Sequence, residues 1–368
     1  MNNARTISML ALAIAIATLG CAYAERAATN NGETTKPILG VKDVCAWPNF
    51  VLMPDGSILA TIFNNPSHAT SPGDIETHIS RDGGKTWEYL STPGPREPDT
   101  LRNHQAAGLA NNGDLVTLTT GWSNVYPEGE SGNNYRAGLV HPWVSRSTDG
   151  GKTWEINRSE GAVAPAPNGD NRIVFGNIMP GADGDLRVAV YTTIWPGGTG
   201  QDRSWVYRST DDGKTWGDPV LIDDEIALNE TAILHLGDGQ WLSAARHGAR
   251  GGGLQLHRST DDAKTWTDEG RVSGPNAHPG HLLLLKDGGI VLTYGNRNVN
   301  PRRVEARISD DDGKTWSQPI HVVEWTGDGG YPTTVEREDG KLVTAFYASS
   351  TEAYNGYQMS TVIWELED

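Results

Sequence analysis

An eight-residue pattern, Ser-x-Asp-x-Gly-x-Thr-Trp, occurs five times along the 368-residue chain. Successive copies begin 67, 62, 50 and 50 residues apart, and only the fourth departs from the pattern, with Ala263 in the glycine position. The copies are Ser80–Trp87, Ser147–Trp154, Ser209–Trp216, Ser259–Trp266 and Ser309–Trp316. Repetition at such intervals indicates one supersecondary unit used several times. Each interval is long enough for a four-stranded sheet, so the pattern favours a β-propeller.

Each copy of the pattern is expected to form a turn between two antiparallel strands. Short alternating runs precede the copies, as in Trp205–Arg208 and Leu254–His257. In such a turn the Asp and Ser side chains bind backbone amides, Gly permits a positive φ, and Trp packs between sheets. Calcium binding is disfavoured because the segments lack the length and the closing Glu of an EF-hand loop. We therefore expect these acids to be structural.

A second repeated signal is an Asp-Gly or Asn-Gly step that interrupts an apolar strand, and it occurs six times. The steps lie in Met53–Gly56, Asn111–Gly113, Ala182–Gly184, Gly237–Gly239, Lys286–Gly288 and Glu338–Gly340. Such steps are typical of hairpin turns. With 13 Trp, 44 Gly and 20 Pro, the chain is predicted to be an all-β, six-bladed β-propeller. The segment Ser360–Trp364 is expected to return beside N-terminal residues and close the ring, which removes exposed sheet edges.

Residues 1–24 are predicted to be a signal peptide, because Arg5 precedes an apolar run that ends at small residues. Cleavage after Ala24 and a lipoprotein signal ending at Cys21 both remain open, and the run is too short to span a bilayer. We interpret residues 25–39 as a linker and 40–368 as the propeller. The protein is expected to be exported, as a periplasmic, secreted or outer-membrane lipoprotein, and monomeric. The net charge of −16 disfavours a nucleic-acid partner.

The first strand of each blade should run outward from the centre to its Asp-Gly turn, so residues at a fixed distance before the turns should surround one mouth of the channel. Eight positions before the turn Asp or Asn lie Trp47, His104, Phe175, Glu230, Pro279 and Tyr331. Several of these side chains can contact a sugar through an aromatic face, an imidazole, a carboxylate or a phenol. The alignment therefore predicts a glycan site at the inner ends of the strands.

The repeated pattern resembles the Asp-box of the sialidase (neuraminidase) superfamily over residues 40–368. Asn229–Ile233 with Arg246 resembles the segment that carries the activating Glu and a carboxylate-binding Arg, and Gly330–Pro332 resembles the segment that carries the tyrosine nucleophile. The resemblance implies that Tyr331 is the nucleophile, Glu230 its base and Arg246 a clamp for the substrate carboxylate. A neutral phenol can approach an anionic sugar that would repel a second carboxylate.

The resemblance also implies a second clamp arginine before the fifth copy of the pattern. We expect Arg303 in that role in preference to Arg302, with Arg297 as a nearby substitute. Sialidases usually open the first blade with Arg-Ile-Pro, but the corresponding stretch here is Cys45–Pro48, which contains Trp47 as a possible substrate contact. Arg102 or His104 is a candidate to replace the missing arginine.

The resemblance to sialidases also implies a general acid in the loop before the first copy of the pattern, between Asn64 and Asp74. Both His68 and Asp74 are candidates. Asp74 lies later than the acid of sialidases, in a context that resembles the start of a strand. No His-Glu-x-x-His motif or Cys/His cluster occurs, and His278 with His281 is a weak two-ligand signal. We therefore expect neither a catalytic metal nor a cofactor.

These residues favour a retaining exo-glycosidase that releases a terminal acidic sugar, sialic acid or a related keto or uronic acid. Two alternatives remain open. One is a uronate-acting hydrolase or polysaccharide lyase on the same fold, with His104 and Tyr331 as base and acid. The other is a non-catalytic glycan-binding propeller, which the altered Arg-Ile-Pro stretch would suit.

Overall fold

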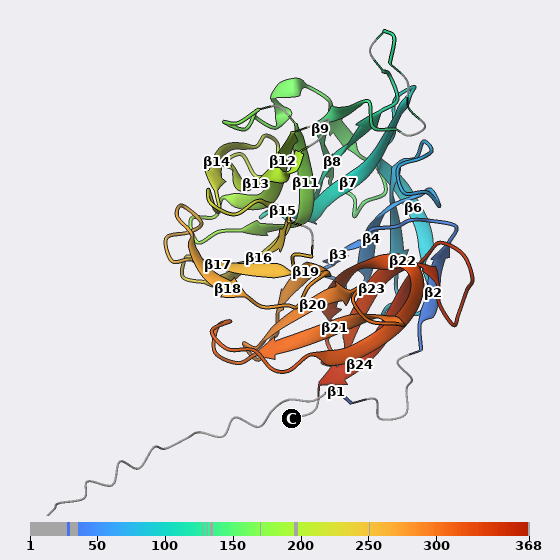
Figure 1. Ribbon diagram of the computed structural model, residues 1–368, viewed down its shortest axis with the longest axis vertical. Coiled ribbons are helices and arrows are strands. Elements are labelled where there is room, and N and C mark those ends of the chain that lie inside the picture. Colours follow the sequence, from blue (N-terminus) through green and yellow to red (C-terminus); the bar gives the residue numbers. More distant parts are fainter. Residues whose placement is uncertain are drawn as a thin grey trace, which may run out of the picture.

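The computed structural model describes residues 28–29, 36–126, 128–130, 132, 135–169, 171–194, 198–249 and 251–366, and these form an all-β fold (Figure 1). The expected signal peptide, residues 1–24, and most of the expected linker lie outside the described residues. The strands are β1 (Ala28–Thr29), β2 (Ile38–Lys42), β3 (Asn49–Leu52), β4 (Ile58–Phe63), β5 (Ile75–Ser80), β6 (Glu88–Gly94), β7 (Thr100–Leu109), β8 (Leu115–Ser123), β9 (Gly138–Ser147), β10 (Glu155–Asn157), β11 (Arg172–Pro180), β12 (Leu186–Ile194), β13 (Gly198–Ser209), β14 (Gly217–Leu221), β15 (Leu228–Gly237), β16 (Gln240–His247), β17 (Leu254–Ser259), β18 (Thr267–Arg271), β19 (Ala277–Leu284), β20 (Ile290–Asn296), β21 (Arg302–Ser309), β22 (Ile320–Glu336), β23 (Leu342–Ser350) and β24 (Gln358–Leu366). A single 3₁₀ turn, η1 (Glu160–Ala162), is described among them.

The strands pair in chain order as antiparallel meanders. β3 to β6 form one sheet and β15 to β18 another, whereas β7 to β14 and β19 to β24 with β1 and β2 form larger sheets. A short parallel contact between β7 and β11 joins the two halves of the β7–β14 sheet. Figure 1 shows the groups arranged around a central region that β7, β11, β15 and β19 approach.

The six predicted hairpins are confirmed, because each Asp-Gly or Asn-Gly step joins two antiparallel strands. The pairs are β3 with β4, β7 with β8, β11 with β12, β15 with β16, β19 with β20 and β22 with β23. These short connections hold the first strand of each pair in a defined register, which fixes which of its residues reach the central region.

The five copies of the eight-residue pattern form turns with one shared set of hydrogen bonds, as predicted. In the first, Ser80 Oγ donates to Asp82 Oδ1 at 2.8 Å, and the amide and hydroxyl of Thr86 donate to the two oxygens of Asp82 at 2.9 and 2.7 Å. The Trp87 ring stacks on Phe50, 5.2 Å between centroids. The same bonds recur around Asp149, Asp211, Asp261 and Asp311.

The C-terminal strand closes against the N-terminal part of the chain, as expected for Ser360–Trp364. Strand β24 pairs antiparallel with β23 on one edge and with β2 on the other, where Ile38 lies opposite Thr361. Figure 1 shows β2 beside β24. This pairing covers an edge that would otherwise expose unpaired backbone groups. Among the described residues, no helix has the length and apolar character needed to cross a bilayer.

Candidate active site

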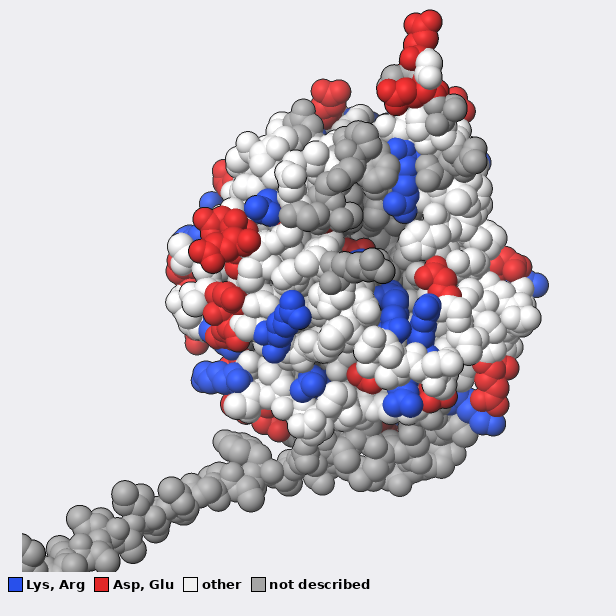
Figure 2. All heavy atoms as spheres, viewed as in Figure 1, with Lys and Arg blue, Asp and Glu red and all other residues white. Residues whose placement is uncertain are grey.

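The inner ends of the strands enclose a cavity of about 560 Å³, here called the central cavity. Of the six residues found by counting back from the turns, five line it: Trp47, His104, Phe175, Glu230 and Tyr331. Figure 2 shows Lys and Arg side chains beside a hollow near the centre of one face. Counting back from the turns therefore identifies five residues that lie on, or just before, the first strands of five different hairpins. The fold brings these residues together around the cavity.

Glu230 lies at the centre of a three-residue contact. The Tyr331 hydroxyl, from β22, donates a hydrogen bond to Glu230 Oε1. Arg246, from β16, donates to the other oxygen, Oε2, at 2.6 Å. Both carboxylate oxygens of Glu230 are thus engaged, one by a phenol that can lose a proton and one by a permanent cation.

The electrostatics of this contact favour a charged Glu230 and a neutral Tyr331. Burial alone would raise the pKa of Glu230, but the Arg246 cation and the hydrogen bond from Tyr331 outweigh it, so the pKa lies below its usual value. Burial and the nearby Glu230 charge both raise the pKa of Tyr331 far above its usual range. The resting pair is therefore a carboxylate that accepts a hydrogen bond from an intact phenol.

Two aromatic residues of the central cavity have left-handed backbone conformations. Trp47 has φ of 40° and Tyr331 has φ of 55°. Bulky residues rarely adopt positive φ, and such strain persists where surrounding contacts over-determine it, most often at functional sites. Here the two rings contact each other edge-on, with centroids 6.2 Å apart.

His104 lines the central cavity as a neutral hydrogen-bond acceptor. Trp122 Nε1 donates to His104 Nε2 at 3.1 Å, which requires that Nε2 carry no proton. Burial lowers the pKa of His104 to about 3. A neutral imidazole cannot replace a clamp arginine, and its Nε2 is already occupied.

Arg102, the other candidate for that replacement, does not line the central cavity. Its guanidinium is fully buried, lies 3.3 Å from the centroid of the Trp143 ring and donates to the Thr119 carbonyl at 3.0 Å. These contacts give the side chain a structural role within the β7–β14 sheet.

The two candidates for the general acid are placed differently. Asp74 directly precedes β5, as its sequence context suggested, and its carboxylate forms a 2.6 Å ion pair with Arg96 away from the central cavity. His68 does line the cavity, and its Nδ1 lies 3.2 Å from Asp328 Oδ2. The ring of Trp47 packs edge-on against that of His68, 5.0 Å between centroids.

Of the three candidates for the second clamp arginine, Arg297 lies nearest to Tyr331. Its guanidinium carbon is 5.4 Å from the centroid of the Tyr331 ring, and its Nε donates to the Gly329 carbonyl at 2.9 Å. Arg303 instead lies 3.6 Å from Glu324, and Arg302 donates to the carbonyl of Gly327. The preference for Arg303 over Arg297 therefore finds no support in this arrangement.

Comparison with known proteins identifies the family. The family model of the BNR repeat-like domain matches residues 122–344. The chain belongs to this BNR-repeat family. A sialidase from Micromonospora viridifaciens is 28% identical over 224 residues, which are 56% of this chain and 33% of that protein. A sialidase from Bacteroides fragilis strain YCH46 is 30% identical over 119 residues, 27% of this chain and 22% of that protein.

Solved structures show the same fold. An unknown function protein from Dyadobacter fermentans superposes with a TM-score of 0.74 at 22% identity, covering 90% of this chain and 98% of that one. Trypanosoma rangeli sialidase gives 0.63 at 16% identity, covering 89% and 55%. These structural matches show a β-propeller-like fold. The BNR-repeat model together with the two curated relatives supports the sialidase superfamily. The chain spans at most a third of the length of those curated sialidases.

Two charged residues of the central cavity were missed by sequence reasoning. Asp202, on β13, receives a hydrogen bond from Asn229 Nδ2 at 2.9 Å, and burial raises the pKa of its carboxyl. Arg136 reaches the cavity from the segment between β8 and β9, and its guanidinium carbon lies 5.5 Å from the centroid of the Trp122 ring. The long first interval of the repeat signalled an insertion there, but not which of its residues faces the cavity.

Proposed function

We propose that this protein is a retaining exo-glycosidase of sialidase type that releases a terminal acidic sugar. The observation that carries the proposal is the contact between the Tyr331 phenol and the Glu230 carboxylate in the central cavity. Arg246 supplies a cation beside them, and a guanidinium can hold a sugar carboxylate through two parallel hydrogen bonds. The sialidase relatives support the same class of reaction.

In the proposed first step, Tyr331 Oη attacks the anomeric carbon while Glu230 accepts the phenolic proton. The bond to the aglycone breaks as an acid donates a proton to the leaving oxygen, and a glycosyl–tyrosine intermediate forms. In the second step water attacks the anomeric carbon and gives a proton to the carboxylate left by the acid, while Glu230 returns its proton to the departing phenolate. Two displacements on one carbon retain the anomeric configuration.

Among the candidates for the general acid, Asp202 fits the cavity best. A general acid must be protonated before the reaction, and burial raises the pKa of this carboxyl. Asp74 is held by Arg96 outside the cavity, which removes it from this role. Asp202 faces the same space as Glu230 and Tyr331 and therefore supplies a second carboxyl within reach of a bound sugar.

The larger architecture is part of the same proposal. We infer that β2 to β24 make six four-stranded blades, with the long strand β22 shared between the fifth and the sixth. We also infer that the eight-residue turns are five Asp-boxes. We further propose that residues 1–24 direct export, with or without a lipid anchor, and that the protein acts as a monomer. Mass spectrometry of the exported protein tests the cleavage site and any lipid on Cys21, and light scattering tests the oligomeric state.

The activity is tested by incubating the purified protein with sialosides, keto-acid and uronate-capped glycans. We expect free acidic sugar, with retained configuration at first release by NMR. Tyr331→Phe should abolish release, whereas Tyr89→Phe, at a 58% exposed tyrosine on β6, should not. Absorbance of an unsaturated uronate would establish elimination instead, and binding without turnover of any substrate would establish a glycan-binding propeller.

A further inference from the structure

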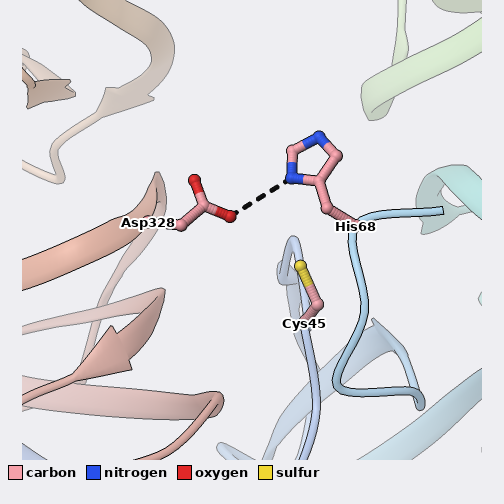
Figure 3. Close-up of side chains that lie close together, drawn as sticks. All are labelled: Cys45, His68 and Asp328. Carbon is pink, nitrogen blue, oxygen red and sulfur yellow. Dashed lines mark hydrogen bonds and ion pairs between the residues drawn. The ribbon is translucent and has the colours of Figure 1, made fainter. Parts of the chain in front are cut away.

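Three metal-ligating side chains meet beside the central cavity: Cys45, His68 and Asp328 (Figure 3). Cys45 precedes β3, His68 lies in the loop between β4 and β5, and Asp328 lies in β22, so three distant segments supply them. One ligand atom from each lies within 4.8 Å of both others. Figure 3 shows that the ring nitrogen of His68 nearer to Asp328 is Nδ1, at 3.2 Å from Oδ2.

The surrounding residues hold this cluster in place. The Tyr357 hydroxyl donates to Asp328 Oδ2 at 3.1 Å, which orients the carboxylate. The amide of Cys45 donates to the carbonyl of Asn65 at 2.8 Å, which ties the cysteine to the loop that carries His68. Cys45 is fully buried, whereas the side chains of His68 and Asp328 are 46% and 36% exposed. The cluster therefore has a fixed inner side and an accessible outer side.

We propose that Cys45 Sγ, His68 Nδ1 and an Asp328 carboxylate oxygen bind one zinc ion. Sulfur, imidazole and carboxylate are the three donor types that protein zinc sites use, with bonds of about 2.0–2.3 Å. In a tetrahedral site such bonds place the donor atoms about 3.3–3.8 Å apart, so small movements close the observed cluster around an ion. Three protein ligands leave a fourth position, which the exposed side of the cluster opens to water or to an anion.

Charge and donor chemistry favour zinc over other occupants. A thiolate and a carboxylate together balance the charge of a divalent cation, with His68 neutral. Calcium and magnesium select oxygen donors, so a cysteine at the fixed inner side disfavours them. The Tyr357 hydroxyl then acts as the outer partner that orients the carboxylate ligand, as is common around bound zinc.

A nucleophilic Cys–His–Asp arrangement explains the cluster less well. In such an arrangement the histidine uses one ring nitrogen for the acid and the other for the thiol. Here Nδ1 faces Asp328, and Figure 3 shows Nε2 directed away from the sulfur. Cys45 is also fully buried, so a substrate cannot reach its sulfur.

The inference goes beyond the proposed function and departs from the sequence expectation of no metal. His68 lines the central cavity, and Asp328 lies three residues before Tyr331 on the same strand. A bound ion would link the β4–β5 loop to β22 and fix the wall of the cavity beside Trp47. It would also assign His68 a structural role, not that of general acid.

The test measures zinc binding directly and is independent of glycosidase activity. The reduced, chelator-treated protein is titrated with Zn²⁺ against a chromophoric competitor, and with Co²⁺ to follow the near-ultraviolet charge-transfer absorption of a cobalt–thiolate bond. We expect one tight site per chain, a Tm that rises with Zn²⁺, and the thiolate band. Cys45→Ser should remove the band, and Asp328→Asn and His68→Gln should each weaken Zn²⁺ binding at least a hundredfold.

The matched control is His321→Gln, at a partly exposed histidine on β22 that lies 3.6 Å from Glu324 and outside the cluster. It should bind zinc as the unchanged protein does. If Cys45→Ser fails to fold, the two variants at partly exposed positions decide. Absence of a one-to-one site, or zinc binding that survives both Asp328→Asn and His68→Gln, would overturn the inference, whatever the glycosidase assays give.

Discussion

The Tyr331 hydroxyl donates a hydrogen bond to Oε1 of Glu230, although 101 residues separate the two in the sequence. The fold brings them together because each lies the same number of residues before an Asp-Gly hairpin, on the strand that leads into it. In this geometry the carboxylate is already positioned to accept the phenolic proton. In the proposed mechanism, neither side chain would need to rearrange before the phenol acts as a nucleophile.

Glu230→Gln tests the role of this carboxylate as a base. An amide cannot accept the phenolic proton, so kcat/KM should fall by about 10²–10⁴. The pKa of Glu230 is lowered from 4.5, so the unchanged protein should lose activity only as the pH falls below that value. The sign follows because the ionised form is active and acid removes it. The pH profile of kcat/KM provides the measurement.

The same substitution should also change stability, since Arg246 loses its anionic partner. The Glu230 side chain is 10% exposed and that of Arg246 is 32% exposed, so we expect a loss of about 1–3 kcal/mol in the free energy of unfolding. Ionised Glu230 stabilises the fold above its unfolded pKa, and that stabilisation disappears as the pH falls through the lower folded pKa. Glu225→Gln, at an exposed acid, is the control. Undiminished activity of Glu230→Gln would contradict the assignment of Glu230 as the base.

The sequence predicted the central residues because short hairpins fix the register of the strands. Counting back from each turn found five residues of the central cavity, but Pro279 does not line it, whereas Gly280 and His281 do. The pairing of β19 with β20 shifts register between Ala277 and Gly280. Similar shifts occur in β7, β11, β15 and β22, whose counted residues do line the cavity. The turn motifs therefore locate the inner part of each strand to within one or two residues.

The other differences arise where no turn fixes the geometry. Arg303 lies on the third strand of its group, directly opposite Glu324, and this cross-strand pairing takes its side chain away from Tyr331. Asp202 also comes from a third strand, and Arg136 comes from an insertion. Their distances from the repeated motifs vary from blade to blade, so spacing alone does not place them at the cavity.

Asp202→Asn tests the proposed acid. Loss of a proton donor matters most when the leaving group is poor, so hydrolysis of an alkyl glycoside should slow by about 10²–10⁴. An aryl glycoside, whose leaving phenol is acidic, should keep most of its rate. Initial rates on matched alkyl and aryl substrates provide the comparison. Asp224→Asn, at an exposed acid, should leave both rates unchanged. Equal losses on the two substrates would assign Asp202 a structural or binding role.

His104 should stay neutral across the physiological pH range. Its pKa is lowered to about 3, first by burial, and Nε2 accepts a hydrogen bond from Trp122. In heteronuclear NMR spectra its ring signals should not shift between pH 8 and pH 5. A shift centred near pH 6.5 would show that the imidazole of His104 gains a proton in the folded protein, and would contradict a neutral ring whose Nε2 accepts the Trp122 hydrogen bond.

The same pKa difference predicts how stability depends on pH. An unfolded histidine gains a proton near pH 6.5 whereas folded His104 does not until about pH 3, so acid favours the unfolded chain within this window. Within this window His104 alone should therefore lower the free energy of unfolding by up to about 1.4 kcal/mol for each unit by which the pH decreases. His104→Gln should reduce that slope in urea unfolding curves, because Gln can accept the Trp122 hydrogen bond without titrating.

Ala263→Gly should stabilise the protein at the one turn that departs from the repeated pattern. Ala263 has φ of 64°, and the residues at its position in the four other copies are Gly84, Gly151, Gly213 and Gly313, with φ of 91°, 87°, 88° and 81°. A side chain in this region costs about 1–2 kcal/mol, while a new glycine adds disorder to the unfolded chain. We therefore expect a net gain of about 0.5–1 kcal/mol in unfolding experiments. Ala353→Gly, at an exposed alanine for which no positive φ is recorded, should give no gain. A loss of stability in Ala263→Gly would show that the Ala263 methyl group, buried against its neighbours in the core, contributes more than the backbone strain costs.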